Sequence, residues 1–533
     1  MSWLPGEKLH YAETHFKFKL PWSFLYRPWP EIIVDAPFQF VKGSKPALWI
    51  VVRDGDHFPV TLEKIDVELV RTTGENTEAA NTESTETISR TLDIEANEAF
   101  GFYRVELGEL PAGTYKATAT ICVRHDGKKK RFARWNLPGL KPAPLRFQVL
   151  AEELPKPNGY AFGEMHCHTH YSSDHVEYGA TPEVMQQAAK AVGLDFVNFT
   201  DHAYDFAFTD EDYTKEAETP VTKFQRLKEE IANLPRSPLL LAGEEVSAGN
   251  SKGENVHMTV LGPEGYLPGI GDCGRYWLDN KPTRRIDQIL DMTTAPCFAA
   301  HPWQQMSALE RFIFRRGYWH SEDLQMDRPH SIRGIQFWNG IRDEGFTLGR
   351  DWWIEELGKE HYLLPIAGND AHGDLNDTTS VALPLISLRH SREHVFGKVR
   401  TAIYVGPDGE AASSGKTASC QQLSCEGLQK AFLGDNCFIT DGPALWWERG
   451  NGALAFHARS NREMGGGFRY ILIYGRRRLM NGKLAETEEV LKESLVAAPE
   501  TADLRIPTAG FAYLRAECET ATGRFALTSA AQL

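Results

Sequence analysis

Long apolar runs and paired cysteines are both missing from this sequence. No run of about 18 apolar residues occurs, so we expect no transmembrane helix. The first residues also lack the charged start and the long apolar core of a signal peptide. The eight cysteines are scattered and form no CxxC pair. This pattern argues against a disulfide framework and predicts a protein of the reducing cytoplasm.

An excess of positive charge is absent as well. The formal net charge is −14, which argues against a nucleic-acid duplex or an anionic membrane held by bulk electrostatics. We therefore expect a small-molecule substrate and no nucleic-acid or membrane partner, while the oligomeric state stays open. The length of 533 residues exceeds what one hydrophobic core usually serves, so several domains are expected.

The character of the chain changes twice and predicts three domains. Residues 1–155 hold short segments rich in β-branched and aromatic residues, which predict an immunoglobulin-like β-sandwich with Tyr115 as its corner tyrosine; another small antiparallel domain is the alternative. The polar stretch 74–87 is interpreted as a loop. Residues 156–445 alternate strands with helices, as parallel α/β architectures do. Residues 446–533 return to strands and predict a smaller β-sandwich-like domain.

Histidine is concentrated in the middle of the chain, where eleven of the eighteen lie between His166 and His372. Most of the predicted strands there end in His, Asp or Glu, and the ends of parallel strands converge on one pocket. Alternation along a strand sends both histidines of His166-Cys167-His168 to the same side. The candidate metal ligands are His166, His168, Asp174, His202, Glu245, His257, His301, Asp370 and His372.

A set of nitrogen and oxygen ligands without sulfur suits zinc, manganese or iron, and nine ligands suffice for two or three divalent cations. A carboxylate can bridge two ions where an imidazole cannot, so Glu245 is the expected bridge. Alternation sends the adjacent Glu244 to the other side. Asp201 and His202 are the candidate catalytic residues, with Asp201 expected to orient ligands or bound water. Arg342 is a candidate phosphate contact.

The order of these motifs resembles the PHP (polymerase and histidinol phosphatase) superfamily: H-x-H, T-D-H, G-x-E, H-x3-LG, HP and D-x-H. GLDFVNFTDH, FWNG and AGNDAHGD are similar to its carbaryl-hydrolase-like (CehA/McbA-like) branch of metallohydrolases. The resemblance covers residues 160–385 and implies an α/β fold, a distorted (β/α)7 TIM-like barrel, flanked here by the two β-sandwich domains.

The resemblance also implies three ion sites. The first site is formed by His166, His168, Glu245 and Asp370, and the second by Glu245, His257 and His301. The third is formed by Asp174, His202 and His372. Some members of the superfamily carry His in place of Asp174, so two ions are the alternative to three.

These motifs together predict a metal-dependent hydrolase that uses metal-activated water, because no G-x-S-x-G or comparable nucleophile motif competes. The resemblance implies phosphoesters as substrates, with carbamates, esters or amides as the alternative. A further alternative is a non-catalytic binding protein with a vestigial barrel, which the complete ligand set opposes.

Overall fold

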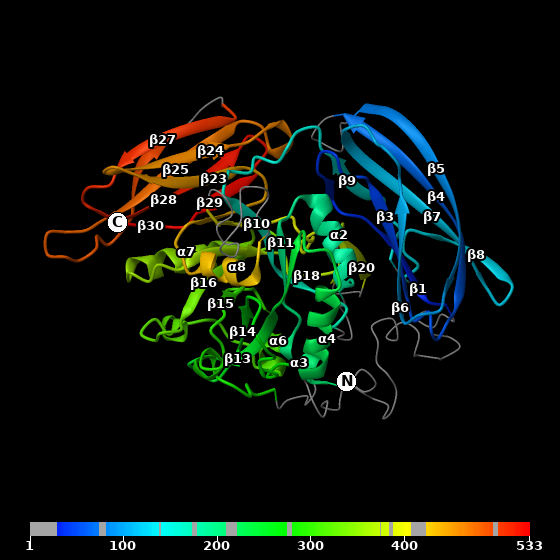
Figure 1. Ribbon diagram of the computed structural model, residues 1–533, viewed down its shortest axis with the longest axis horizontal. Coiled ribbons are helices and arrows are strands. Elements are labelled where there is room, and N and C mark those ends of the chain that lie inside the picture. The colour runs from blue at the N-terminus through cyan, green and yellow to red at the C-terminus, as the bar shows by residue number, and fades with distance from the viewer. Residues whose placement is uncertain are drawn as a thin grey trace.

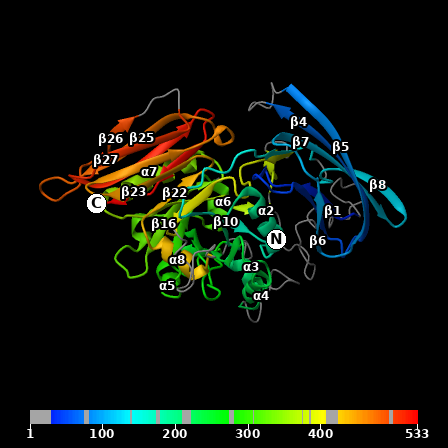
Figure 2. The same cartoon turned by 45° about the horizontal axis from the view of Figure 1, so that its top comes forward.

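The fold of this protein is dominated by strands, which hold 45% of the residues against 16% in helices. In the computed structural model, the N-terminal and C-terminal strands lie on opposite sides of a central part that carries the helices (Figure 1, Figure 2). The structure describes residues 29–73, 81–137, 140–172, 179–208, 221–273, 280–306, 308–373, 375–382, 387–406, 423–493 and 499–533.

The N-terminal strands form two sheets whose buried side chains share one hydrophobic cluster. One sheet has the order β1 (Glu31–Asp35), β3 (Ala47–Arg53), β6 (Phe100–Glu106). The other has the order β2 (Gln39–Phe40), β9 (Leu145–Val149), β7 (Gly113–His125), β4 (Val60–Thr73), β5 (Asn81–Ala96). The Tyr115 hydroxyl donates to the carbonyl of Pro111 at 2.6 Å, the contact expected of a corner tyrosine.

The loop predicted for residues 74–87 is wrong over its second half. Asn81 already pairs with Thr73, and β5 continues beside β4 to Ala96. Residues 84–87 are exposed, and their polar side chains suit a strand whose outer face meets solvent. Residues 74–80 lie outside the described part of the chain.

Three parallel strands begin the central part: β10 (Tyr160–His168), β11 (Phe196–Phe199) and β12 (Leu239–Ala242). The helix α2 (Pro182–Val192) connects the first two and α4 (Val221–Ala232) connects the next two. Both ends of α2 are capped, because the Thr181 side chain accepts from Val184 N and Gly193 ends the helix at φ 84°.

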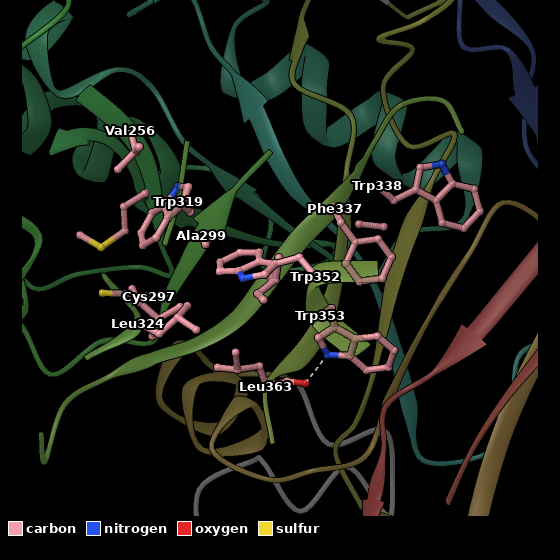
Figure 3. Packing of buried hydrophobic residues seen from close by; sticks show 14 of the residues in the cluster. Val256, Cys297, Ala299, Trp319, Leu324, Phe337, Trp338, Trp352, Trp353 and Leu363 are labelled. Atoms are coloured by element: carbon pink, nitrogen blue, oxygen red, sulfur yellow. Dashed lines mark hydrogen bonds between the residues drawn. The ribbon is translucent and has the colours of Figure 1, made fainter. Parts of the chain in front are cut away.

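A second central sheet has the order β13 (Glu244–Gly249), β14 (Asn255–Val260), β15 (Cys297–Ala300), β16 (Ile332–Asn339), β17 (Leu364–Gly368). The helix α7 (Glu344–Gly358) packs on it through Trp352 and Trp353. Figure 3 shows the Trp353 indole beside Phe337, with Trp353 Nε1 donating to the carbonyl of Leu363 at 2.8 Å.

The predicted (β/α)7 TIM-like barrel is wrong. The predicted strands do not close into one parallel barrel but divide between these two sheets, and β13, β14 and β15 run antiparallel. Residues 239–249 do not form one continuous strand, because the chain is interrupted at Gly243 between β12 and β13. A Cβ at Gly243 would lie 2.4 Å from Asn198 Oδ1 and 2.6 Å from two carbonyl oxygens, so the chain passes there only as glycine.

The first central sheet continues without a break into the C-terminal strands. After β10 come β21 (Arg400–Tyr404), β22 (Cys437–Thr440), β29 (Phe525–Thr528), β28 (Phe511–Thr520) and β25 (Phe468–Arg477). A three-stranded sheet of β23 (Ala444–Gly450), β24 (Ala453–Arg459) and β27 (Thr501–Pro507) shares a hydrophobic cluster with the last of these. The domain limits at 155 and 445 remain predictions.

None of the helices in the described ranges has both the length and the hydrophobicity that crossing a membrane requires.

Candidate metal centre

The ends of the central strands bring eight of the nine predicted ligands together. The short strand β18 (Ala371–His372) runs parallel to β10 and pairs His372 with His168. A backbone bridge joins His202, directly after β11, to Glu245 in β13. Pairing between strands that are far apart in sequence therefore builds the site. Within each of three groups of these residues, one ligand atom per residue lies within 4.8 Å of all the others.

The first group consists of His166, His168, Glu245 and Asp370. His166 Nε2 lies 3.3 Å from both Glu245 Oε2 and Asp370 Oδ1. His168 Nε2 lies 3.5 Å and 3.1 Å from the same two oxygens. Both histidines are fully buried, and they share one face of β10 as alternation requires.

The second group consists of Glu245, His257 and His301. The other carboxylate oxygen of Glu245, Oε1, lies 2.6 Å from His257 Nδ1 and 3.0 Å from His301 Nε2. Glu245 therefore turns one oxygen toward each of two groups, which is the geometry of a bridging ligand.

The third group consists of His168, His202 and His372. The rings of His168 and His372 are stacked with their centroids 3.9 Å apart, and the centroid of the His202 ring lies 4.5 Å from that of His168. The resemblance assigned Asp174 in place of His168 to this site, and Asp174 lies outside the described residues. His168 is thus shared between the first and third groups.

Hydrogen bonds to the far side of several of the imidazoles fix which nitrogen faces the centre. His166 Nδ1 donates to Gln336 Oε1 at 2.8 Å, and His257 Nε2 donates to Asp272 Oδ2 at 2.9 Å. His372 Nδ1 donates to the carbonyl of Asp370 at 3.1 Å. Such contacts leave the opposite nitrogen with its lone pair toward the centre, as in histidines that bind metals.

The nitrogen and oxygen atoms that point toward the centre are better placed to bind metal ions than to bind one another. His166 Nε2, His202 Nδ1, His257 Nδ1 and Glu245 Oε2 are buried without a hydrogen-bond partner among the described residues, although they lie within 2.6–3.3 Å of neighbouring ligand atoms. A buried polar atom without a partner is costly, and a cation at their common focus would remove that cost.

The charges also favour cations. Burial raises the pKa of Glu245, but the surrounding histidines outweigh it and hold that pKa well below its ordinary value. Burial likewise raises the pKa of Asp370, and His166 and His168 bring it well below the usual range. Both carboxylates are therefore ionised at neutral pH. The buried charge of Glu245 and the partly buried charge of Asp370 face imidazoles, which bind divalent cations in their neutral form.

Two of the candidate ligands have a strained backbone conformation. His301 has a φ of 27° and Asp370 a φ of 53°, in the left-handed region that residues with a side chain rarely adopt. Both follow directly or closely after a strand, β15 and β17. Such strain persists where the surroundings hold a residue in place for function.

Asp201 and Glu244 are buried beside the ligands but face elsewhere. The Asp201 carboxylate accepts from Thr169 N at 2.7 Å, from Thr169 Oγ1 at 2.8 Å and from Ser172 Oγ at 2.8 Å. Since Ser172 Oγ is also 3.0 Å from His168 Nδ1, Asp201 orients a ligand through Ser172. Glu244 Oε2 accepts from Leu267 N at 2.8 Å, outside all three groups.

A pocket of about 190 Å³ opens beside His301. Gln304 and Asn339 line it with amides, and Asp343 and Glu393 line it with carboxylates. No Lys or Arg is present among the described residues that line it. Arg342, the candidate phosphate contact, instead binds Glu519 and the carbonyl of Gly523.

Several residues that support the ligands escaped the sequence analysis. Asp272 lies in a loop, binds Arg316 at 2.7 Å as well as His257, and carries no motif that would identify it. Asn339 lies in the segment FWNG, Gln336 directly precedes that segment, and Asn339 Nδ2 donates to Asp370 Oδ2 at 3.1 Å. The end of β16 was thus a visible signal, whereas Asp272 was not.

No family model and no curated protein matches this chain. Solved structures that align with it include a CARDB domain from Pyrococcus furiosus in complex with di-metal ions: 13% identity, 23% of this chain, 90% of that chain, TM-score 0.12. A β-D-mannosidase from Dictyoglomus thermophilum aligns at 11% identity over 94% of this chain and 66% of its own, with a TM-score of 0.21. A β-glucuronidase from Parabacteroides merdae aligns at 9% identity over 93% and 63%, with a TM-score of 0.16. This chain spans about two thirds or less of the two glycosidases. At these scores neither fold nor function follows from the likeness.

Proposed function

We propose that this protein is a metal-dependent hydrolase. The observation that carries the proposal is the position of Glu245, whose two oxygens face separate groups of buried histidines. His166, His168, Glu245 and Asp370 would hold one divalent cation, Glu245, His257 and His301 a second, and His202 and His372 would contribute to a third. Zinc, manganese or iron suit such ligands.

Divalent cations bound in such groups supply Lewis acidity and lower the pKa of coordinated water toward neutrality. The residues of this chain supply the remaining functions. Gln336 and Asp272 hold the rings of His166 and His257, so that the ligand atoms keep their spacing. Asn339 holds Asp370 and also lines the pocket, where its amide is placed to contact a bound substrate.

The pocket beside His301 favours uncharged substrates. Its described wall carries two carboxylates and three amides, and no Lys or Arg that would bind a phosphate outside the metals. Carbamates, esters and amides are therefore the substrate class that we propose first. Phosphoesters, which the resemblance to the PHP superfamily implies, are the second candidate; membership of that superfamily, in its carbaryl-hydrolase-like branch, is part of this proposal.

Metal analysis and a substrate panel test the proposal. The protein is reconstituted with Mn²⁺, Zn²⁺ or Fe²⁺ in turn, its metal content is measured, and aryl carbamates, aryl esters and aryl phosphates are offered. We expect at least two ions per chain and faster turnover of the uncharged substrates. Glu245→Gln serves as the inactive control, since it removes the shared carboxylate.

The outcomes separate the alternatives. Fewer than one ion per chain after reconstitution would contradict the metal centre. Full metal content without turnover of any substrate would favour the non-catalytic binding protein. The cytoplasmic location also stays a proposal, supported by the seven described cysteines, all of which carry free thiols.

A further inference from the structure

A cavity of about 610 Å³ lies apart from the metal centre, where three parts of the chain meet. The N-terminal strands β4, β7 and β9 contribute Thr72, Thr114 and Gln148 to its wall. The C-terminal part contributes Gly465 and Thr522. The N-terminal and C-terminal strands reach toward each other above the central part, on either side of the connection from β9 to β10 (Figure 1). This volume is in the range of small-molecule sites.

The wall of the cavity gathers positive charge in a chain whose net charge is −14. Five arginines line it, against the two carboxylates of Glu152 and Glu463. The arginines are Arg71, Arg146, Arg392, Arg462 and Arg524. They come from segments spread over the whole chain, so that folding, and not a local basic run, assembles them.

Three of these guanidinium groups are oriented by neutral backbone oxygens. Arg71 Nη2 donates to the carbonyl of Ala112 at 2.7 Å. Arg392 Nε donates to that of Asn376 at 3.1 Å, and Arg524 Nη1 to that of Asp441 at 2.8 Å. A carbonyl fixes the direction of a guanidinium without neutralising its charge, so these contacts position positive charge at the cavity.

The other two arginines have no side-chain partner at all within the described chain. No hydrogen bond or ion pair joins the guanidinium of Arg146 or Arg462 to another described residue. Arg392 likewise forms no ion pair there. The carboxylate of Glu463 is already engaged, because it accepts from the backbone of Ala151 and Glu152 at 2.9 Å each.

The guanidinium groups in the cavity wall repel one another. Burial is the main cause that lowers the pKa of Arg392; Asp377 raises it, and the charge of Arg146 lowers it. Like charges held close together in a partly buried wall destabilise the empty cavity, and a bound anion reverses that cost.

We propose that this cavity binds a small polyanion, a molecule that carries two or more phosphate or carboxylate groups. One phosphate or carboxylate group is bound by one or two guanidinium groups. Five guanidinium groups around a single cavity are therefore more than a monoanion can contact. The threonine hydroxyls and the Gln148 amide add neutral donors. The site is independent of the proposed hydrolase activity, because it shares no lining residue with the metal groups.

Calorimetric titration with tripolyphosphate, citrate and inorganic phosphate tests this site. The variants Arg146→Gln and Arg462→Gln each remove one exposed guanidinium that has no partner in the fold. Arg505→Gln is the matched control, since Arg505 is exposed on β27 and does not line the cavity. All titrations are repeated in Glu245→Gln, because divalent ions at the metal centre would also bind phosphate.

We expect tripolyphosphate or citrate to bind more tightly than inorganic phosphate. Each cavity variant should weaken that binding about tenfold, the loss of one charge-assisted contact, and Arg505→Gln should leave it unchanged. Binding should persist in Glu245→Gln. The proposal is overturned if none of the three anions binds, if binding is the same in Arg146→Gln and Arg462→Gln as in the wild type, or if it disappears only in Glu245→Gln.

Discussion

Glu244 and Glu245 are neighbours in β13, yet their carboxylates have different surroundings. Glu245 faces the four histidines of the first two groups and also His202, whereas Glu244 accepts a hydrogen bond from Leu267 N on the other side of the strand. Burial raises the pKa of Glu244 well above its ordinary value and so favours the protonated, uncharged form of its side chain. A glutamine therefore resembles Glu244 in charge and shape, but replaces an ionised ligand at position 245.

The first prediction follows from this contrast. Glu245→Gln should lose at least one ion per chain together with hydrolytic activity, because the carboxylate shared by two groups is gone. Glu244→Gln should keep the metal content and activity of the wild type. Elemental analysis of both purified variants after reconstitution measures the difference. Equal losses in the two variants would contradict the assignment of Glu245 as the bridge.

Asp272 contacts the proposed metal centre through His257. Its carboxylate accepts from His257 Nε2 at 2.9 Å and from Arg316 Nε at 2.7 Å, and burial leaves it no contact with solvent. The negative charge of Asp272 holds the imidazole ring so that Nδ1 faces Glu245. Asp272 is thus a positioning residue for the second group.

We predict that Asp272→Asn weakens metal binding by about 10–100-fold, the usual effect of removing a carboxylate that orients a histidine ligand. Competition with a chromophoric chelator measures the affinity. Asp291→Asn is the control, because Asp291 is an exposed partner of Arg328 away from the site. Unchanged affinity in Asp272→Asn would remove Asp272 from the support of the centre.

That the candidate ligands lie together could be predicted from the sequence, whereas the residues that hold them in place could not. His166 and His168 are two residues apart on one strand, so their common face follows from alternation alone. Asp272 reaches His257 from a loop fifteen residues later, and such a contact depends on the tertiary fold. Ser172 is similar, because its link between Asp201 and His168 requires the turn after β10.

At the scale of elements, buried polar contacts join residues 375–377, which follow β18, to the N-terminal part of the chain. We call this set of contacts the seam. Asp35 Oδ2 accepts from Leu375 N at 2.9 Å, and Arg134 Nη1 donates to Asp377 Oδ2 at 2.8 Å. Asn376 completes the seam through contacts with the backbone of Arg146. These polar groups are buried, so the seam excludes water and its charges feel the low dielectric of the interior.

Asp35 should make the stability of this seam depend on pH. Burial raises its pKa from 3.8 to about 7; Arg134 lowers it and Asp377 raises it. Between these values the folded protein holds a proton that the unfolded chain has released. The contribution of Asp35 to the free energy of unfolding is therefore largest below pH 4. It falls as the pH rises toward 7, by up to about 1.4 kcal/mol per pH unit.

Asp35→Asn removes this titration while keeping an oxygen for Leu375 N. The variant should therefore be relatively more stable, against the wild type, at pH 8 than at pH 5. Urea unfolding of both proteins at the two pH values measures the change. Parallel behaviour of the two proteins between pH 5 and pH 8 would show that Asp35 is not protonated in the fold.

The elements were predicted more accurately than their assembly. The caps of α2 depend only on residues next to the helix, so Thr181 and Gly193 indicate its two ends in the sequence. The barrel was inferred from strand and helix alternation, but alternation does not reveal that β13 and β14 pair antiparallel. Gly243 could have signalled the break between β12 and β13, since glycine inside a strand pattern often marks a close approach of another backbone.

At the scale of the whole molecule, one sheet unites parts that the sequence analysis treated as separate. The 11-stranded sheet runs from β12 through β10 and β22 into β28 and β25, so the central and C-terminal parts share backbone hydrogen bonds. The N-terminal part is joined to them by the Arg134–Asp377 ion pair and by the hydrogen bond from Ala151 N to the Glu463 carboxylate. A backbone hydrogen bond from Val41 N to the carbonyl of Ala191 also joins it to α2. The metal centre therefore lies in a frame to which all three parts contribute.

The last prediction is that the N-terminal part supports the metal centre through Asn376. This buried side chain accepts from Arg146 N and donates to the carbonyls of Arg146 and Ala36, four residues after the ligand His372. Asn376→Ala should weaken metal binding about tenfold, since the lost hydrogen bonds are worth roughly 1 kcal/mol each and the loop bearing His372 loosens. Asn136→Ala is the matched control, because Asn136 makes comparable contacts with Ile32 and Pro30 within the N-terminal part alone. Both variants should lower the thermal midpoint, and only Asn376→Ala should release metal faster to a chelator. Equal release from the two variants would mean that the N-terminal part stabilises the fold without acting on the centre.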